Sequence, residues 1–327
     1  MTSPERRGDV IYLPTPPPKI TYEEHLQEVQ SINQQLAAVL LAITTNFQGP
    51  RLTRRDWLAF LAATFPYVDQ ARRDIADAAR RFYDSERAEH VEPVEMRVVD
   101  VLDDDDGAVV IEDDSNVVVD FYERFPIDLP PYDPDWYEEA MDAVVVDMSQ
   151  PDADDAVVVD TVETAMKEAE NGGRRATMWA VERDPRPVGW ARVQGGERSC
   201  GFCAMLISRG PVYVRGSGRG KRNAPTRAGL EVADETRAVE IWRQAQATGD
   251  ESELNKLMNR WHPGCDCKVV PVFDRNEWPG RDEYLRMEEA WKKHAKGDNT
   301  KERFNAFRRY IERDRRSVRR IKLPTAA

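Results

Sequence analysis

The sequence predicts an α+β fold with a helical N-terminal region, an acidic middle segment and a small C-terminal domain, stapled by cysteine and histidine, that ends in helices. Three observations lead to this prediction. Apolar residues recur at spacings of three and four in two long N-terminal stretches. Acidic residues concentrate in the middle, and all four cysteines fall in two tight clusters. With 327 residues, the chain has room for roughly two domains of ~150 residues each.

The N-terminal segment, residues 1–19, is polar and rich in proline. Proline cannot join the interior of a helix or a central strand, so we expect a flexible arm. The arm contains no apolar core of the kind found in signal peptides, and we therefore expect a protein made in the cytoplasm and not secreted by that route. No apolar run in the chain approaches the ~18 residues that suggest a membrane span.

Residues 20–95 are expected to form a hairpin of two helices. Each helix opens on a capping pattern, Thr21 with Glu24 and Thr53 with Asp56, in which two side chains satisfy backbone N–H groups that the helix leaves free. Apolar residues then recur at helical spacings and mark one face of each helix. They are Leu26, Val29, Ile32, Leu36, Val39, Leu40 and Ile43, followed by Trp57, Leu58, Leu61, Phe65, Val68, Ile75, Ala79 and Phe82.

Residues 96–130 are expected to form an acidic insertion or linker, of which residues 98–115 are expected to be exposed and in part disordered. Between residues 98 and 160 the chain has 21 Asp or Glu and one Arg, a net charge of −20. Because the whole chain carries −12, the remainder carries +8, and the overall acidity does not exclude local contact with an anion such as DNA. Valine runs at residues 117–119, 144–146 and 157–159 fit either short strands or helix edges.

Residues 131–280 are expected to form a domain around the cysteines, followed by amphipathic and basic helices in residues 281–327. The domain opens on a helix with Pro134 in the first helical position. A second helix is expected to end at the Asn171-Gly172-Gly173 sequence, because glycine commonly terminates helices.

The cysteines and one histidine form the clearest candidate site. Cys200 and Cys203 make a C-x-x-C pattern, and His262, Cys265 and Cys267 make an H-x-x-C-x-C pattern about 60 residues later. A C-x-x-C turn places two thiolates on one side of a tight loop, which is half of a common tetrahedral zinc site. Zinc takes four ligands in such sites, so one of the five candidates is spare.

We favour Cys200, Cys203, His262 and Cys265 as ligands of a structural zinc ion, with Cys267 as the alternative fourth ligand. Thiolate-rich sites without an open position are usually structural, and this one would join distant segments so that binding energy becomes folding energy. Two other interpretations stay open. The cysteines are ordinary reduced thiols, or Cys265 or Cys267 forms a disulfide.

Two basic segments are candidates for contact with an anion. The tail at residues 301–327 has ten Lys or Arg against three acidic residues, and its apolar residues follow helical spacing. We interpret it either as a solvated helix face or as a surface for packaged DNA or an acidic partner, which would bind with steep salt dependence. Its candidate residues are Arg308, Arg309, Arg313, Arg315, Arg316, Arg319 and Arg320. The basic stretch at 215–222 departs from the phosphate-loop spacing, so we interpret it as a flexible loop.

Hydrolytic chemistry has little support in the sequence. The chain has four histidines and neither a G-x-S-x-G nor an H-E-x-x-H pattern. Ser208 and Ser217 precede His262, but no spacing rule identifies a nucleophile. We therefore name no catalytic residues and do not expect an enzyme, with a Ser/His protease as the alternative.

Around the cysteines the chain resembles the MuF-like minor capsid (head morphogenesis) proteins of tailed phages of actinobacteria. The resemblance covers about residues 132–273 and is looser over the N-terminal helices. It is carried by residues 171–174, 184–186, 189–193, 200–206, 208–213 and 261–273. The insertion around residues 103–114 departs from the compact linker that is usual in this family.

The resemblance implies a low-copy protein of the procapsid interior, made in the host cytoplasm and located in the virion. Its implied partners are the portal protein, the major capsid or scaffold protein, and packaged DNA, with no membrane and no small-molecule substrate. Residues 131–280 are then the MuF-like domain. Because relatives are often labelled capsid maturation protease, the alternative function is a protease acting on scaffold or capsid protein.

Overall fold

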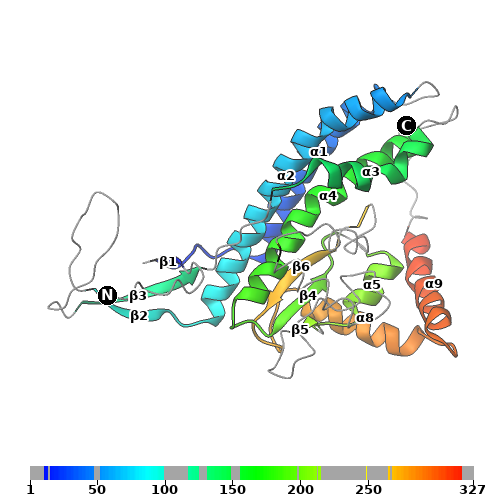
Figure 1. Ribbon diagram of the computed structural model, residues 1–327. Coiled ribbons are helices and arrows are strands. Elements are labelled where there is room, and N and C mark those ends of the chain that lie inside the picture. Colours follow the sequence, from blue (N-terminus) through cyan, green and yellow to red (C-terminus); the bar gives the residue numbers. More distant parts are fainter. Residues whose placement is uncertain are drawn as a thin grey trace, which may run out of the picture.

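The computed structural model describes residues 11–13, 15–47, 52–98, 117–124, 131–148, 155–196, 199–211, 213–214, 248, 264–265 and 267–318. Within these residues the predicted α+β class is confirmed: long helices make up most of the structure and two small antiparallel sheets complete it. Figure 1 shows a bundle of long helices, with one sheet at its end and the other packed beside it.

Four helices form what we call the helical body. They are α1 (Tyr22–Thr44), α2 (Arg54–His90), α3 (Pro134–Met148) and α4 (Asp155–Arg183). Helices α1, α2 and α4 run side by side, and α3 lies against α4 (Figure 1). Both predicted capping boxes are present, Thr21 with Glu24 and Thr53 with Asp56. The predicted helical hairpin therefore starts where its caps indicate.

One apolar cluster fills the space between these helices. Its buried members are Val29, Leu36, Leu40, Trp57, Phe60, Leu61, Val68, Ala71, Ile75, Ala78, Tyr132, Tyr137, Met141, Val144, Val162, Ala165 and Ala169. The sequence predicted an apolar face on α1 and on α2, and most of the buried residues of these faces belong to this cluster. Leu58, which was also predicted to lie on the face of α2, is 44% exposed. The helical spacing thus identifies the face of each helix that packs.

Helix α4 is longer than the sequence predicts. The expectation that the helix ends at Asn171-Gly172-Gly173 is wrong, because α4 continues through this sequence to Arg183. The glycines let α4 approach α2 closely: a Cβ on Gly172 would lie 2.3 Å from the backbone oxygen of Arg72. Here glycine serves the close packing of two helices rather than helix termination.

The first sheet lies at the end of α2. Its strands β1 (Ile11–Leu13), β2 (Val94–Val98) and β3 (Val117–Arg124) are antiparallel in the order β1-β3-β2. Strand β1 thus lies within the expected arm and β3 within the expected insertion, since both are rich in residues that suit a pleated sheet. Residues 99–115 of the segment expected to be partly disordered lie outside the described residues. Of the three valine runs, the first is in β3 and the others are in α3 and α4.

The remaining elements form what we call the cysteine lobe. They are β4 (Gly189–Val193), α5 (Gly201–Ile207), β5 (Tyr213–Val214), β6 (Lys268–Val272), α8 (Arg281–His294) and α9 (Thr300–Val318). The antiparallel sheet has the order β5-β4-β6, and every residue of β4 and β6 is buried. Helices α2 and α4 of the body and α5 of the lobe pack against these strands. Burial of a strand on both faces favours its nearly continuous apolar sequence.

The two predicted C-terminal helices are present as α8 and α9. Helix α9 packs against α5 and α8, with Phe307 completely buried between them. A Cβ on Gly201 of α5 would lie 2.6 Å from the Arg308 side chain, so the two helices are in close contact. None of the helices in the described part of the chain has both the length and the apolarity that a membrane crossing requires.

Candidate metal centre

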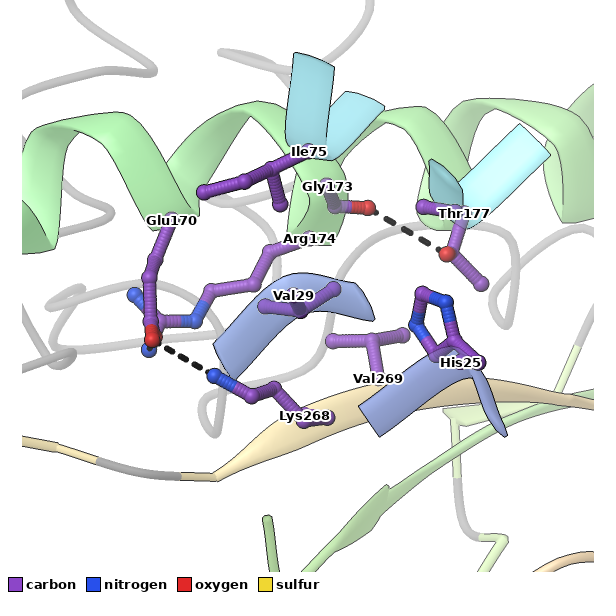
Figure 2. Close-up of a pocket in the computed structure, with 10 residues that line it drawn as sticks. His25, Val29, Ile75, Glu170, Gly173, Arg174, Thr177, Lys268 and Val269 are labelled. Carbon is purple, nitrogen blue, oxygen red and sulfur yellow. Dashed lines mark hydrogen bonds and ion pairs between the residues drawn. The ribbon is translucent and has the colours of Figure 1, made fainter. Parts of the chain in front are cut away.

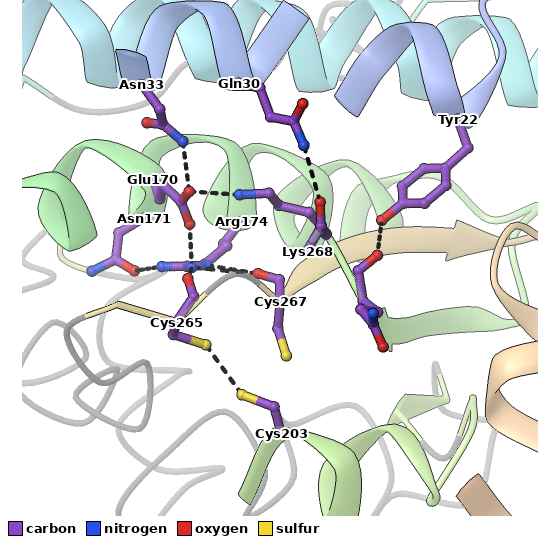
Figure 3. A network of polar contacts seen from close by, with 12 residues as sticks. Tyr22, Gln30, Asn33, Glu170, Asn171, Arg174, Cys203, Cys265, Cys267 and Lys268 are labelled. Atoms are coloured by element: carbon purple, nitrogen blue, oxygen red, sulfur yellow. Dashed lines mark hydrogen bonds and ion pairs between the residues drawn. The ribbon is translucent and has the colours of Figure 1, made fainter. Parts of the chain in front are cut away.

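Three thiol groups meet in the interior of the cysteine lobe. Cys203 lies on α5, and Cys265 and Cys267 lie in the segment that leads into β6. Their sulfur atoms are all within 4.8 Å of one another, and those of Cys203 and Cys265 are 3.3 Å apart (Figure 3). All three residues are buried. Two clusters that are distant in sequence therefore converge at one point in space.

Cys200 lies next to this group. It is the N-cap of α5, and its sulfur accepts the backbone N–H of Cys203 at 3.3 Å. The Cys203 thiol is hydrogen-bonded to the thiols of Cys200, Cys265 and Cys267, and these bonds raise the pKa of Cys203. The C-x-x-C pattern thus begins a short helix whose first turn directs one thiol into the cluster and keeps the other beside it.

The turn before Cys265 depends on glycine. Gly264 has φ +67°, in the left-handed region that other residues rarely adopt. A Cβ at this position would also lie 2.6 Å from a carboxylate oxygen of Glu163 on α4. After the turn, β6 pairs with β4, with Lys268 opposite Val193, which fixes the position of Cys267 at the start of the strand.

A buried network of charges supports the same segment from the side of the helical body. Arg174 of α4 donates hydrogen bonds to the backbone oxygens of Cys265 and Cys267 and pairs with Glu170 (Figure 3). Glu170 also accepts from Lys268 at 2.5 Å and from Asn33 of α1 at 2.7 Å. Burial alone would raise the pKa of Glu170, but Lys268 and Arg174 hold it below its usual value.

The surroundings act differently on the three thiols, since hydrogen bonding and burial raise the pKa of Cys203 and Cys267, whereas nearby cations favour negative charge. Hydrogen bonds from Cys203 and Cys267, together with the charge of Arg174, lower the pKa of Cys265 although burial opposes this shift. The charge of Arg192, a completely buried residue of β4, also acts on Cys267. Metals bind thiolates rather than thiols, so nearby cations promote the form that binds. A Zn–S bond is about 2.3 Å long, and sulfurs this close together can all reach one ion.

The structure brings together Cys203, Cys265 and Cys267, with Cys200 beside them, and none of the four cysteines is in a disulfide. His262 lies outside the described residues. The choice of four ligands among the five candidates therefore stays a prediction. The group can bind a metal ion, and its chemistry of several buried thiols suits a soft divalent ion such as zinc.

Five of the seven predicted basic residues belong to α9, which packs against α5. Arg308, Arg309 and Arg313 are exposed, and Arg308 also lies 3.7 Å from Glu312. Arg315 and Arg316 belong to the same helix, but the structure does not describe their side chains. Arg319 and Arg320 lie outside the described residues. The basic loop at 215–222 also lies outside the described residues.

Sequence reasoning missed the charged network behind the cysteines. Glu170 and Arg174 are four residues apart on one helix, a spacing that usually indicates a surface pair. Lys268 directly follows Cys267, so the sequence indicates that Lys268 lies near the site, but it does not indicate that Lys268 is buried. Only the packing of α4 against β6 shows that these charges face the cysteine segment.

A small cavity of about 20 Å³ lies between α1, α4 and β6, beside this network (Figure 2). It has room for about one water molecule. His25 lines the cavity and stacks on Phe82, with ring centroids 4.8 Å apart. Burial, followed by the charges of Lys268 and Arg81, lowers the pKa of His25 to about 4, so its ring is neutral at neutral pH. The cavity is too small for an organic substrate.

Ser208, His90 and His294 make contacts of a structural kind. Ser208 donates a hydrogen bond to the backbone oxygen of Met205 at the end of α5. The rings of His90 and His294 stack on Phe273 and Tyr310. Ser217, the other serine noted before His262 in the sequence, lies outside the described residues. These contacts add nothing in favour of hydrolysis.

Comparison with known proteins identifies the family. The chain matches the family model described as VG15 protein over residues 18–294. It is 31% identical to the Gene 15 protein of Mycobacterium phage L5 over 313 residues, which cover 90% of this chain and 96% of that protein. It is also 31% identical to the Gene 15 protein of Mycobacterium phage D29 over 301 residues, which cover 86% and 95%. No solved structure matches the chain. The matched region includes the helical body and all four cysteines, and the chain belongs to the VG15 family of phage proteins.

Proposed function

We propose that this protein is a MuF-like minor capsid protein of a tailed phage, with a structural role in head morphogenesis inside the procapsid near the portal. The observation that carries the proposal is the convergence of the two cysteine motifs, on which the MuF-like resemblance rests, into one buried thiol cluster. Membership of a family with relatives in mycobacteriophages supports a location in the virion.

The metal centre has a structural role in this proposal. Cys203 and Cys267 are 1% and 0% exposed, so a bound ion would have little access to a substrate. A closed, thiolate-rich site is typical of structural zinc, whose binding contributes directly to folding. A zinc ion at this position would join α5 to the start of β6 and so hold the cysteine lobe together.

The proposed partners are the portal protein, the major capsid or scaffold protein, and packaged DNA. Support for an anionic partner comes from the exposed arginines of α9, Arg308, Arg309 and Arg313. Because α9 packs directly on α5, the helix that carries Cys203, loss of the metal should also disturb this basic surface.

Cys203→Ser, introduced into the phage, tests the proposal. Ala204→Ser is the matched control, because it adds a hydroxyl at the next position of α5, also fully buried, and keeps every thiol. We expect about one zinc ion per purified wild-type and control chain and almost none for Cys203→Ser. Elemental analysis measures the metal, and mass spectrometry of purified heads measures how much of the protein is incorporated.

Loss of metal together with lower incorporation and fewer filled heads, for Cys203→Ser alone, would support the structural role. Normal heads that contain no copy of the protein would contradict a role in head morphogenesis. Unprocessed scaffold or capsid protein in otherwise complete heads would instead identify a maturation protease. A wild-type protein without metal would refute the zinc centre.

A further inference from the structure

Arg174 makes several of its hydrogen bonds to the segment that carries two of the thiols. It is 3% exposed, and its Nη2 lies 3.0 Å from the backbone oxygen of Cys265 and 3.3 Å from that of Cys267. Its Nε lies 3.4 Å from the same oxygen of Cys267. Its Nη1 donates to Asn171 at 3.0 Å, which fixes the plane of the group. One side chain of the helical body therefore holds both ends of the C-x-C segment (Figure 3).

The charge of Arg174 has a second consequence. Glu170 pairs with both Arg174 and Lys268, so these three buried groups together carry one positive charge. Arg192 adds another cation on the strand beside β6. A divalent ion with three thiolates carries −1, and with four it carries −2, and a buried charge is costly unless it is paired. The positive charges of Arg174 and Arg192 next to the cluster therefore favour thiolates over neutral thiols.

We propose that Arg174 is the positioning residue of the metal centre. It orients the backbone at Cys265 and Cys267 so that both sulfurs face Cys203, and its charge offsets that of the thiolates. This inference rests on the proposed metal centre and goes beyond it, because it assigns to the helical body a direct role in metal affinity. Groups that orient metal ligands in this way commonly change affinity by about 10–100-fold when they are replaced.

The test is titration of the reduced, full-length protein with Co²⁺, because the absorption of bound Co²⁺ reports the number and geometry of the thiolates that bind it. Competition with a chelator then measures the affinity for the metal. Arg174→Met removes both the hydrogen bonds and the charge. Arg175→Met is the matched control: Arg175 is the next residue of α4 and equally buried, but its charge acts on Tyr132 in the helical body. We expect Arg174→Met to bind about 10–100-fold more weakly with an altered spectrum, and Arg175→Met to bind like the wild type.

Arg174→Lys keeps the test available if Arg174→Met does not fold. Lysine retains the charge but lacks the planar fork that reaches two carbonyls, so we expect weaker binding than wild type and an altered spectrum. Equal affinity and spectrum for wild type, Arg174→Met and Arg175→Met, or wild-type behaviour of Arg174→Lys, would overturn the positioning role while the metal centre stands. A wild-type chain that binds no Co²⁺ or Zn²⁺ would refute the metal centre itself.

Discussion

Large apolar and aromatic side chains fill the interior of the helical body. The interior of the cysteine lobe also contains thiol groups, and buried charged side chains lie next to it. The body has four helices, three of them long, that share one apolar cluster. Helices α8 and α9 of the lobe have 14 and 19 residues, but the elements around the thiols are strands of two to five residues and a helix of seven. Elements this short bury little area each, and such units commonly depend on a metal or a disulfide.

The difference predicts how each region responds to perturbation. Apolar burial is not directional and needs no ligand, so the body should keep its structure when the metal is removed. The lobe relies on thiols and charges that must be satisfied together, so metal removal should affect it first. The two regions meet where α2 and α4 contact the strands of the lobe, and Arg174 lies at this junction.

The largest effect is expected from a cavity in the body. Phe60 is 1% exposed, and its ring lies 5.1 Å from that of Trp57 and 5.6 Å from that of Phe47. Phe60→Ala should lower the free energy of unfolding by about 3–5 kcal/mol, because it leaves a cavity in a packed core. Urea denaturation followed by circular dichroism measures this change, and elemental analysis should still find the wild-type metal content per folded chain.

Tyr67→Ala is the control on the same helix. Tyr67 is 50% exposed, so its removal should change the free energy of unfolding by less than about 0.5 kcal/mol. A loss of metal in Phe60→Ala that matches its loss of stability would contradict the separation of the two regions.

The extent of prediction from sequence differs between the two regions. The body was accessible because capping boxes and helical spacing are local signals, and both Thr21 and Thr53 cap the helices that they were expected to cap. The same logic failed at Gly172, where the requirement for glycine comes from Arg72, a residue 100 positions away in the chain. A local pattern does not show whether glycine ends a helix or allows another helix to approach.

In the lobe, the sequence motif indicated which residue types belong together but not what surrounds them. The grouping of every cysteine into two clusters was enough to nominate a site that the structure shows as three neighbouring thiols. The role of Arg174 and Glu170 was not accessible, because a Glu–Arg pair at this spacing has the same sequence signature on a surface and in an interior.

The second largest effect is expected in the pH dependence of the free energy of unfolding, through His25 near the junction. The pKa of His25 is about 4 in the folded protein, chiefly because of burial and then because of Lys268 and Arg81, against about 6.5 when unfolded. The unfolded chain therefore binds the proton more readily, and the His25 contribution to stability is complete above about pH 6.5 and falls as the pH drops towards about 4. The loss over this window should be about 3 kcal/mol.

His25→Phe isolates this contribution, since phenylalanine can also stack on Phe82. The difference in unfolding free energy between wild type and variant, measured on metal-free protein at about pH 7.5 and about pH 4, should change by about 3 kcal/mol in favour of the variant at the lower pH. A constant difference would show that His25 is protonated in the folded protein or exposed to water.

A smaller effect is expected from the glycine that shapes the metal segment. Gly264→Ala forces alanine into the left-handed region, at a cost of about 1–2 kcal/mol, and brings its Cβ against Glu163. We expect weaker Co²⁺ binding and a modest loss of stability in the lobe. Adding Glu163→Ala to the variant removes the steric contact but not the backbone strain, so it should restore only part of the affinity. Full restoration would show that the contact alone matters.

The smallest effect compares the two capping boxes. Thr21→Ala and Thr53→Ala each remove the hydroxyl that accepts the backbone N–H of Glu24 or Asp56, and each should lower the free energy of unfolding by about 1 kcal/mol. Their locations differ, because Tyr22, next to the first cap, donates a hydrogen bond to the backbone oxygen of Gln194 at the end of β4. Hydrogen exchange in Thr21→Ala should therefore increase in the first turn of α1 and around β4, whereas in Thr53→Ala it should increase only at the start of α2. The same pattern in both variants would mean that α1 is not a connection between body and lobe, and that their coupling runs through α2 and α4.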